Sequence, residues 1–287
     1  MKILIAIGIL GGLGLLFGLI LAVASKVFYV ETDPRLEKLT DALPGANCGG
    51  CGYAGCGAYA QAVLDGKAEI GRCAAGGDKA AEAMAEVMGV KAEKVERRVA
   101  LVRCSGYKTL DENGKPVGAK LKGEYEGIHD CLAATKVAGR GPLICKFGCL
   151  GFGNCTKVCK YDAIHVVDGV AKVDPEKCVG CMSCAEACPR DLIVPVKYDN
   201  YVVIACASKA KGAVTIRGCS AGCVGCGLCQ KICPEKAIKV EKNLATIDYS
   251  KCTNCGLCAT VCPKHLIVST RDNPEEVLEA ISGNGKH

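Results

Sequence analysis

The sequence lacks most features that would indicate a catalytic or a nucleic-acid-binding protein. It has no tryptophan, only 5% aromatic residues and four histidines in 287 residues. No GxGxxG follows a predicted strand, no GxxxxGK[ST] occurs, and no nucleophile is paired with a general base. The net charge of +6 comes from scattered basic residues, which argues against a nucleic-acid partner. We therefore expect no substrate pocket in this chain.

Cysteine is present in excess, with 24 residues in the chain. Such a density is typical of disulfide-stapled secreted domains, but those are short chains. Zinc and iron–sulfur clusters are the other candidates, and the spacing of the cysteines separates the three.

The N-terminus begins with an uncharged apolar run of 22 residues, Ile3 to Ala24. A helix of that length spans the hydrocarbon core of a bilayer. A cleaved signal peptide is the alternative, because Ala22-Val23-Ala24 resembles a cleavage site, but its apolar region would be shorter. We expect a transmembrane anchor within residues 1–28.

Basic residues around this run indicate its orientation. Lys26, Arg35 and Lys38 follow it, whereas only Lys2 precedes it. The positive-inside rule then places the C-terminal part in the cytoplasm, as a single-pass protein of the inner (cytoplasmic) membrane. A reducing compartment disfavours disulfides and favours metal or redox chemistry.

The second half contains three cysteine tetrads with the spacing CxxCxxCxxxC, each followed by proline. In bacterial ferredoxins three thiolates of this run bind one 4Fe-4S cluster and the fourth binds its neighbour. Zinc sites instead use CxxC pairs separated by a longer loop. The tetrads are Cys178, Cys181, Cys184 and Cys188; Cys223, Cys226, Cys229 and Cys233; and Cys252, Cys255, Cys258 and Cys262.

An internal repeat of 74 residues organises these tetrads. Eight cysteines between Cys145 and Cys188 recur between Cys219 and Cys262, which predicts two ferredoxin-like modules in tandem. Each module contains a short apolar alternation broken by a turn, AIHVVDGVAKVD at 163–174 and AIKVEKNLATID at 237–248. Both segments predict β-hairpins.

One position breaks the repeat, because Phe152 stands where Cys226 stands 74 residues later. The first module thus lacks one standard ligand, and Cys145 is the expected substitute. We expect one cluster for each of four sets: Cys145, Cys149, Cys155 and Cys188; Cys159, Cys178, Cys181 and Cys184; Cys223, Cys226, Cys229 and Cys262; and Cys233, Cys252, Cys255 and Cys258.

A fifth site is predicted by CGGCGYAGC at 48–56. Cys48, Cys51 and Cys56 need a fourth thiolate, and Cys73 is the next cysteine. The glycines between them let backbone N–H groups approach the sulfurs. Zinc bound by the same four residues is the alternative.

Five clusters use twenty cysteines, so four remain. We expect these either to bind a sixth cluster or to be free buried thiols, which behave as small hydrophobes. They are Cys104, Cys131, Cys206 and Cys219.

The predicted fold is α+β, built of small iron–sulfur domains behind a transmembrane helix. We expect a helix over Asp78–Arg98, a hairpin insertion over Tyr107–Gly127 and a closing helix over Asn273–Ile281. The four histidines have no mutual metal-binding spacing. The predicted units are the anchor (1–28), a four-cysteine domain (29–76), a connecting region (77–140), two ferredoxin-like modules (141–205 and 206–270) and a tail (271–287).

An N-terminal membrane helix, CGGCGYAGC with its Cys73, and tandem ferredoxin-like modules together resemble the RnfB family, the B subunits of Rnf ion-translocating ferredoxin:NAD oxidoreductases. The resemblance covers nearly the whole chain and is strongest over residues 1–75 and after Cys145. Two residues depart from the ferredoxin pattern. They are Phe152, and Lys160 where proline commonly follows the fourth cysteine.

The resemblance implies a subunit that accepts electrons from soluble ferredoxin and relays them to membrane subunits. A flavin- and NAD-binding partner then reduces NAD, coupled to export of Na⁺ or H⁺, and this chain binds no NAD itself. The alternatives are an electron-input subunit of a hydrogenase or other dehydrogenase, and a storage protein. We expect ferredoxin to dock on the second module, near Lys231 and Lys236.

Overall fold

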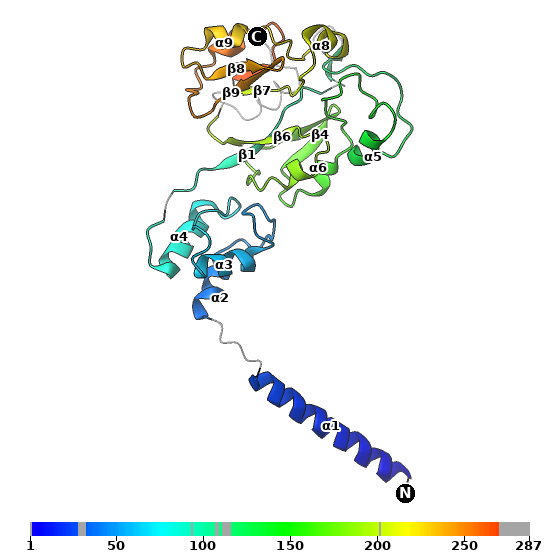
Figure 1. The fold of residues 1–287 in the computed structure, drawn as a ribbon, viewed down its shortest axis with the longest axis vertical. Coiled ribbons are helices and arrows are strands. Elements are labelled where there is room, and N and C mark those ends of the chain that lie inside the picture. The colour runs from blue at the N-terminus through cyan, green and yellow to red at the C-terminus, as the bar shows by residue number, and fades with distance from the viewer. Residues whose placement is uncertain are drawn as a thin grey trace.

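The structure is a computed structural model that places a long N-terminal helix ahead of three small cysteine-rich units (Figure 1). It describes residues 2–27, 33–92, 94–106, 109–110, 116–200 and 202–269. The predicted closing helix over Asn273–Ile281 and the tail lie outside these residues.

The predicted N-terminal helix is present as α1 (Lys2–Val27). Its described side chains are largely exposed, with Leu15 at 79% and Leu21 at 68%. A search of the described residues found no helix both long enough and apolar enough to span a membrane.

The four-cysteine domain is a three-helix unit of α2 (Pro34–Asp41), α3 (Cys56–Leu64) and α4 (Gly77–Met88). Leu39, Tyr59 and Met84 are its fully buried side chains. The helix expected over Asp78–Arg98 ends at Met88, because Gly89 adopts a left-handed conformation (φ +67°) that closes the last turn.

Both predicted hairpins are present. β4 (Ile164–Val167) pairs antiparallel with β5 (Val170–Val173), and β8 (Ile238–Glu241) pairs with β9 (Leu244–Ile247). Asp168 and Gly169 both have positive φ, as do Lys242 and Asn243 in the second turn. Two-residue turns of this kind match the twist of the strands they join.

Each module has a second two-stranded sheet that the cysteine repeat did not predict. β1 (Arg98–Val102) pairs antiparallel with β6 (Ile193–Lys197), and β7 (Val202–Ile204) pairs with β10 (Ile267–Ser269). β1 thus belongs to the first module and β7 to the second, whereas the expected boundaries put β1 in the connecting region and β7 in the first module.

Short helices carry the central cysteines of each module. α6 (Asn154–Lys157), α7 (Ser183–Glu186), α9 (Leu228–Ile232) and α10 (Leu257–Thr260) each follow a residue in the left-handed conformation. Each contains one buried cysteine. These are Cys155, Cys184, Cys229 and Cys258.

The two modules share a hydrophobic core. Val203, Ala205 and Val268 of the second module pack in one buried cluster with Val102 and Ile193 of the first. The shared core fixes the modules relative to each other, and they lie side by side in Figure 1.

The insertion between Cys104 and Cys145 contains the predicted hairpin, formed by β2 (Thr109–Leu110) and β3 (Pro116–Val117). It continues into α5 (Cys131–Lys136), while α8 (Gly212–Gly218) lies in the second module. Isolated bridges join Ala119 to Cys219 and Leu121 to Leu143. Residues 119–121 therefore link the two modules.

Candidate iron–sulfur centres

The N-terminal group brings together the four cysteines that the sequence selected. Cys48, Cys51, Cys56 and Cys73 line one cavity, which Cys181 of the first module also lines. Burial comes first among the causes that raise the pKa of Cys73, and the sulfurs of the other three also contribute.

Two local contacts hold this group. Asn47 accepts a hydrogen bond from the Cys56 N–H through its side-chain oxygen (2.8 Å). Tyr59 donates its hydroxyl hydrogen to the Glu69 carbonyl (2.9 Å), in the loop that leads from α3 to Cys73. Both ends of the Cys56–Cys73 segment are thus fixed.

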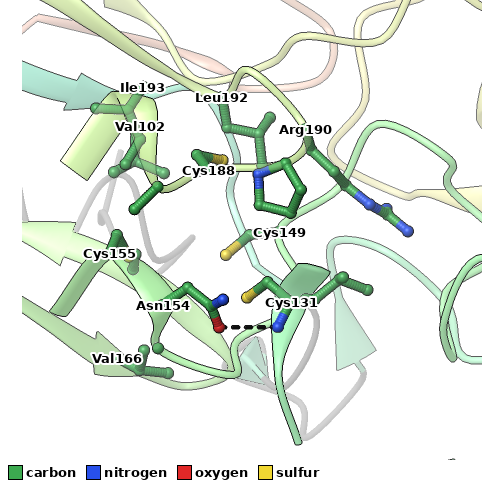
Figure 2. A pocket seen from close by; sticks show the side chains of 15 residues that line it. Val102, Cys131, Cys149, Asn154, Cys155, Val166, Cys188, Arg190, Leu192 and Ile193 are labelled. Atoms are coloured by element: carbon green, nitrogen blue, oxygen red, sulfur yellow. Dashed lines mark hydrogen bonds between the residues drawn. The ribbon is translucent and has the colours of Figure 1, made fainter. Parts of the chain in front are cut away.

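In the first module the structure differs from the sequence expectation. The cavity beside Cys149, Cys155 and Cys188 is also lined by Cys131, and Cys145 is absent from its lining. Figure 2 shows the Cys131, Cys149 and Cys188 side chains facing the same space. Burial, followed by the sulfurs of Cys149, Cys131 and Cys188, raises the pKa of Cys155 to about 12.

Hydrogen bonds to the first turn of α6 hold Cys131 in this position. Asn154 accepts a hydrogen bond from the Cys131 N–H (2.8 Å) and donates one to Asp130 (2.7 Å). Asp130 in turn caps α5 by accepting from the Ala133 N–H (2.8 Å). Because Asn154 directly precedes Cys155, the two cysteines are tied to the same helix end.

Phe152, the residue that breaks the repeat, supports the same segment. Its ring stacks on His129 (centroids 5.1 Å apart) and on Tyr125 (5.3 Å). An aromatic ring thus stands at the repeat position where the second module has the thiol of Cys226. Because His129 precedes Cys131 by two residues, the stack lies next to Cys131 in the chain. His129 contributes packing here, in keeping with the absence of a histidine metal pattern.

Cys145 lies instead with three of the four cysteines left over from the sequence assignment. One cavity is lined by Cys104, Cys145, Cys206 and Cys219. Burial, followed by the Cys145 sulfur, raises the pKa of Cys219 to about 12. The leftover cysteines thus do form a group, with Cys145 in the position expected for Cys131.

The inserted segment explains why Cys145 lies where the sequence predicted Cys131. Lys120 donates its N–H to the Gly218 carbonyl and accepts from the Ile144 N–H, at 2.8 and 2.9 Å. Ser220 also donates to the Gly118 carbonyl (2.9 Å). The segment from Gly118 to Lys120 therefore lies between the residues that flank Cys145 and Cys219.

Cys104 and Cys206 occupy equivalent positions in the two modules. The Cys104 sulfur accepts backbone N–H groups from Gly106 (3.4 Å) and Cys149 (3.3 Å). The Cys206 sulfur accepts them from Ser208 and Cys223, both at 3.4 Å. Cys149 and Cys223 are 74 residues apart and are therefore equivalent in the repeat. The structural repeat thus begins before the cysteine repeat, with a strand and the cysteine that follows it: β1 and Cys104 in the first module, β7 and Cys206 in the second.

The second module agrees more closely with the sequence. Cys223, Cys226, Cys229 and Cys262 line one cavity. Burial is the largest cause that raises the pKa of Cys258 to about 11. A backbone hydrogen bond lowers this pKa, and the sulfurs of Cys252 and Cys255 raise it. Cys233 accepts the Ala237 N–H (3.3 Å), as Cys159 accepts the Ala163 N–H (3.4 Å). In the first module, burial and then the sulfurs of Cys178, Cys181 and Cys159 raise the pKa of Cys184 to about 12.

These groups fit iron–sulfur clusters by their chemistry. At least four thiols line each of these cavities, among mostly apolar atoms. Burial raises the pKa of Cys73, Cys155 and Cys219, so the deprotonated form of these thiols needs a bound cation. Backbone N–H groups aimed at the sulfurs stabilise thiolate charge. A search of the described residues for three or more His, Cys, Asp or Glu around a single metal ion found none.

Family models match three segments of the chain. The Fe-S cluster model FeS matches residues 43–75, the 4Fe-4S binding domain matches residues 171–194, and the 4Fe-4S dicluster domain matches residues 222–266. These segments contain sixteen of the 24 cysteines. The eight outside them include Cys131 and Cys145.

Relatives that match most of the chain carry one description. The chain is 46% identical over 250 residues to the B subunit of the Na(+)-translocating ferredoxin:NAD(+) oxidoreductase complex of Acetobacterium woodii, covering 87% of this chain and 72% of the relative. It is 43% identical over 240 residues to the B subunit of the proton-translocating complex of Clostridium ljungdahlii (83% and 81% covered). It is 35% identical over 247 residues to the B subunit of the ion-translocating oxidoreductase complex of Methanosarcina acetivorans (86% and 90%).

Proposed function

The chain belongs to the RnfB family, the B subunits of ion-translocating ferredoxin:NAD(+) oxidoreductase complexes, and from this premise we propose that six 4Fe-4S clusters carry electrons through it from reduced ferredoxin toward NAD. It is an electron-transfer subunit of an oxidoreductase complex, with 4Fe-4S domains. Family membership favours this role over a hydrogenase subunit or a storage protein. A thiolate-bound cluster supplies one-electron chemistry, and the protein tunes its potential.

The observation that carries the proposal is the grouping of the cysteines, four to a site. We assign the ligands by the cavities and by the repeat where no cavity is described. The sets are Cys48, Cys51, Cys56 and Cys73; Cys159, Cys178, Cys181 and Cys184; Cys131, Cys149, Cys155 and Cys188; Cys104, Cys145, Cys206 and Cys219; Cys223, Cys226, Cys229 and Cys262; and Cys233, Cys252, Cys255 and Cys258.

Contacts between these sets support a single series in that order. Cys181 lines the cavity of the N-terminal set, and the Cys184 sulfur is among the causes that raise the pKa of Cys155. The set containing Cys104 and Cys206 touches a ligand on each side through the N–H···S bonds from Cys149 and Cys223. It therefore bridges the two modules.

Iron analysis of paired Cys→Ala variants tests the assignment. Six clusters predict about 24 iron atoms per chain in anaerobically purified protein. Cys145→Ala with Cys219→Ala removes two ligands of one set and should lose about four irons, whereas Cys131→Ala with Cys219→Ala should lose about eight. The reverse pattern would support the sequence assignment over the structural one.

The position of the chain in the complex is a further part of the proposal. We assign α1 as a single membrane anchor, with the iron–sulfur domains in the cytoplasm, because its uncharged run covers 22 residues and basic residues follow it. The carbonate-washed membrane fraction should retain the full chain and lose a chain without residues 2–27. Flavin- and NAD-binding subunits complete the path, and the coupling ion is Na⁺ or H⁺.

The second module is the proposed ferredoxin docking site. Cys226 and Cys255 are the two exposed cysteines of the chain, and both lie in this module. Lys231 and Lys236 are exposed, and they follow Cys226 within ten residues in the sequence. Exposed ligands shorten the distance to an external donor, and lysines attract an acidic partner.

A further inference from the structure

The N-terminal domain meets the first module through backbone atoms of their cysteine loops. An ideal Cβ built on Gly50 would lie 2.8 Å from the Cys181 carbonyl oxygen and 2.9 Å from its Cα. Gly50 lies between Cys48 and Cys51, and the Ser183 hydroxyl donates to the Cys48 carbonyl (3.4 Å). Two cysteine groups from different domains are thus in direct contact, and only glycine leaves room for it.

Lys160, which departs from the ferredoxin pattern, belongs to the same contact. Its Nζ donates to the carbonyl of Ala46 (2.6 Å) and to that of Asn47 (3.4 Å). The repeat-equivalent positions of Lys160 and Tyr161 are Pro234 and Glu235; Glu235 is exposed, whereas Tyr161 is partly buried. Of the two departures from the pattern, Lys160 therefore lies where the N-terminal domain meets the first module.

Tyr161 places a polar atom at this boundary. Its hydroxyl is buried and has no hydrogen-bond partner of suitable geometry. Burial comes first among the causes that raise the pKa of Tyr161, followed by the sulfurs of Cys48 and Cys181. A buried unpaired hydroxyl is costly, but a neighbouring thiolate would accept its hydrogen bond. Iron binding at Cys48 would supply that thiolate.

We propose that Gly50 and Tyr161 couple the Cys48 group to the Cys181 group, Gly50 by permitting backbone contact and Tyr161 by donating a hydrogen bond to the Cys48 sulfur. The inference rests on the proposed function, because it takes both groups as cluster ligands. Each site supplies one-electron chemistry, so passage of an electron between them forms no bond and moves no proton. Both residues are positioning residues.

Gly50→Ala tests the contact in the full-length protein. Gly50 has no left-handed backbone requirement, so the added methyl acts by steric conflict with Cys181 alone. Reduced four-iron clusters are paramagnetic, and two neighbouring ones broaden each other's EPR signals. G50A should lose the broadening between these two sites while keeping its iron content. G57A is the matched control, since a Cβ there meets no atom within 4 Å.

Tyr161→Phe tests the hydrogen bond with little change in shape. A hydrogen bond to a thiolate stabilises the more negative, reduced state, so Y161F should lower the midpoint potential of the Cys48 site. At fixed ambient potential its reduced-to-oxidised ratio should fall, by the factor that corresponds to the difference in hydrogen-bond strength between the reduced and the oxidised cluster. Y249F is the control, because the Tyr249 hydroxyl donates to the Val202 carbonyl in the second module (3.2 Å).

The possible outcomes distinguish failure of the proposed ligand set from failure of the proposed coupling role. A Cys73→Ala variant identifies the EPR signal of the Cys48 site. If no signal disappears in that variant, the proposed ligand set fails and this inference fails with it. If the signal is assigned but Y161F leaves its potential unchanged, and G50A leaves the broadening unchanged, the proposed function stands and the coupling role is overturned.

Discussion

At the scale of single residues, one exchange separates the sequence expectation from the structure. Phe152 stands at the repeat position of Cys226, and the nearest available cysteine along the chain is Cys145. In the structure Cys131 lines the cavity beside Cys149, Cys155 and Cys188 instead, and Asn154 binds the Cys131 N–H next to Cys155. Sequence distance favoured Cys145, but a ligand is selected by distance in space.

Phe152→Cys should restore the repeat and make Cys131 dispensable. We expect Cys131→Ala to lose about four irons, and the double variant F152C with C131A to regain them, since the new thiol occupies the position of Cys226. The same F152C change in a Cys145→Ala background should restore nothing, because Cys145 lies in another group. Iron and acid-labile sulfide analysis measures both pairs. Rescue of C145A with no rescue of C131A would contradict the structural assignment.

At the scale of elements, local patterns predicted the hairpins and failed at the sheet partners. Turns such as Asp168-Gly169 are recognised from two adjacent residues with positive φ. β1 pairs with β6 across 91 to 99 residues, and no local signal identifies such a partner (Val99 with Val196, for example). The helix expected to reach Arg98 was too long, because Gly89 ends it first.

Disrupting the segment around Lys120 should affect a single cysteine group. Lys120→Pro deletes the N–H that bonds to Gly218, at a cost of about 1–3 kcal/mol in local stability, because the Gly218 carbonyl loses its donor. We expect loss of about four irons, from the group that includes Cys145 and Cys219, with the rest retained. Lys120→Ala keeps the N–H and should behave as the parent protein. Iron content and thermal melting measure the effect; a K120P protein with full iron would mean that the segment does not hold the group.

At the scale of the whole molecule, the cysteine groups form a series from the N-terminal domain to the exposed end of the second module. The described structure supports this order through Cys181 at one junction and through Cys104 and Cys206 at another. The exposed Cys226 and Cys255 then mark the far end. The modest net charge of +6 suits an acidic electron carrier as partner.

Charge reversal at Lys231 and Lys236 tests the docking end. The double variant to Glu should slow reduction by ferredoxin by roughly tenfold at low salt, because electrostatic steering sets the association rate. The difference should vanish near 1 M salt, where the screening length is about 3 Å. Lys79→Glu with Lys91→Glu, two exposed lysines of the N-terminal domain, is the charge-matched control. Stopped-flow kinetics across a salt series measure the effect. Equal reduction rates for the double variant and its control at every salt concentration would exclude this docking face.

The sequence by itself indicated the kind of cofactor and the tandem modules, and it predicted two cysteine sets, those of Cys48 and of Cys223, that each line one cavity in the structure. Cluster ligands can be predicted in this way because they sit at short fixed spacings within a loop and its helix. The sequence also identified the family, through motifs spread over nearly the whole chain. Tertiary structure alone decided the partners of Cys131 and Cys145, the strands β1 and β7, and the contact of Gly50 with Cys181. Each of these joins segments far apart in the chain, where packing and backbone hydrogen bonds determine the neighbour and spacing carries no information.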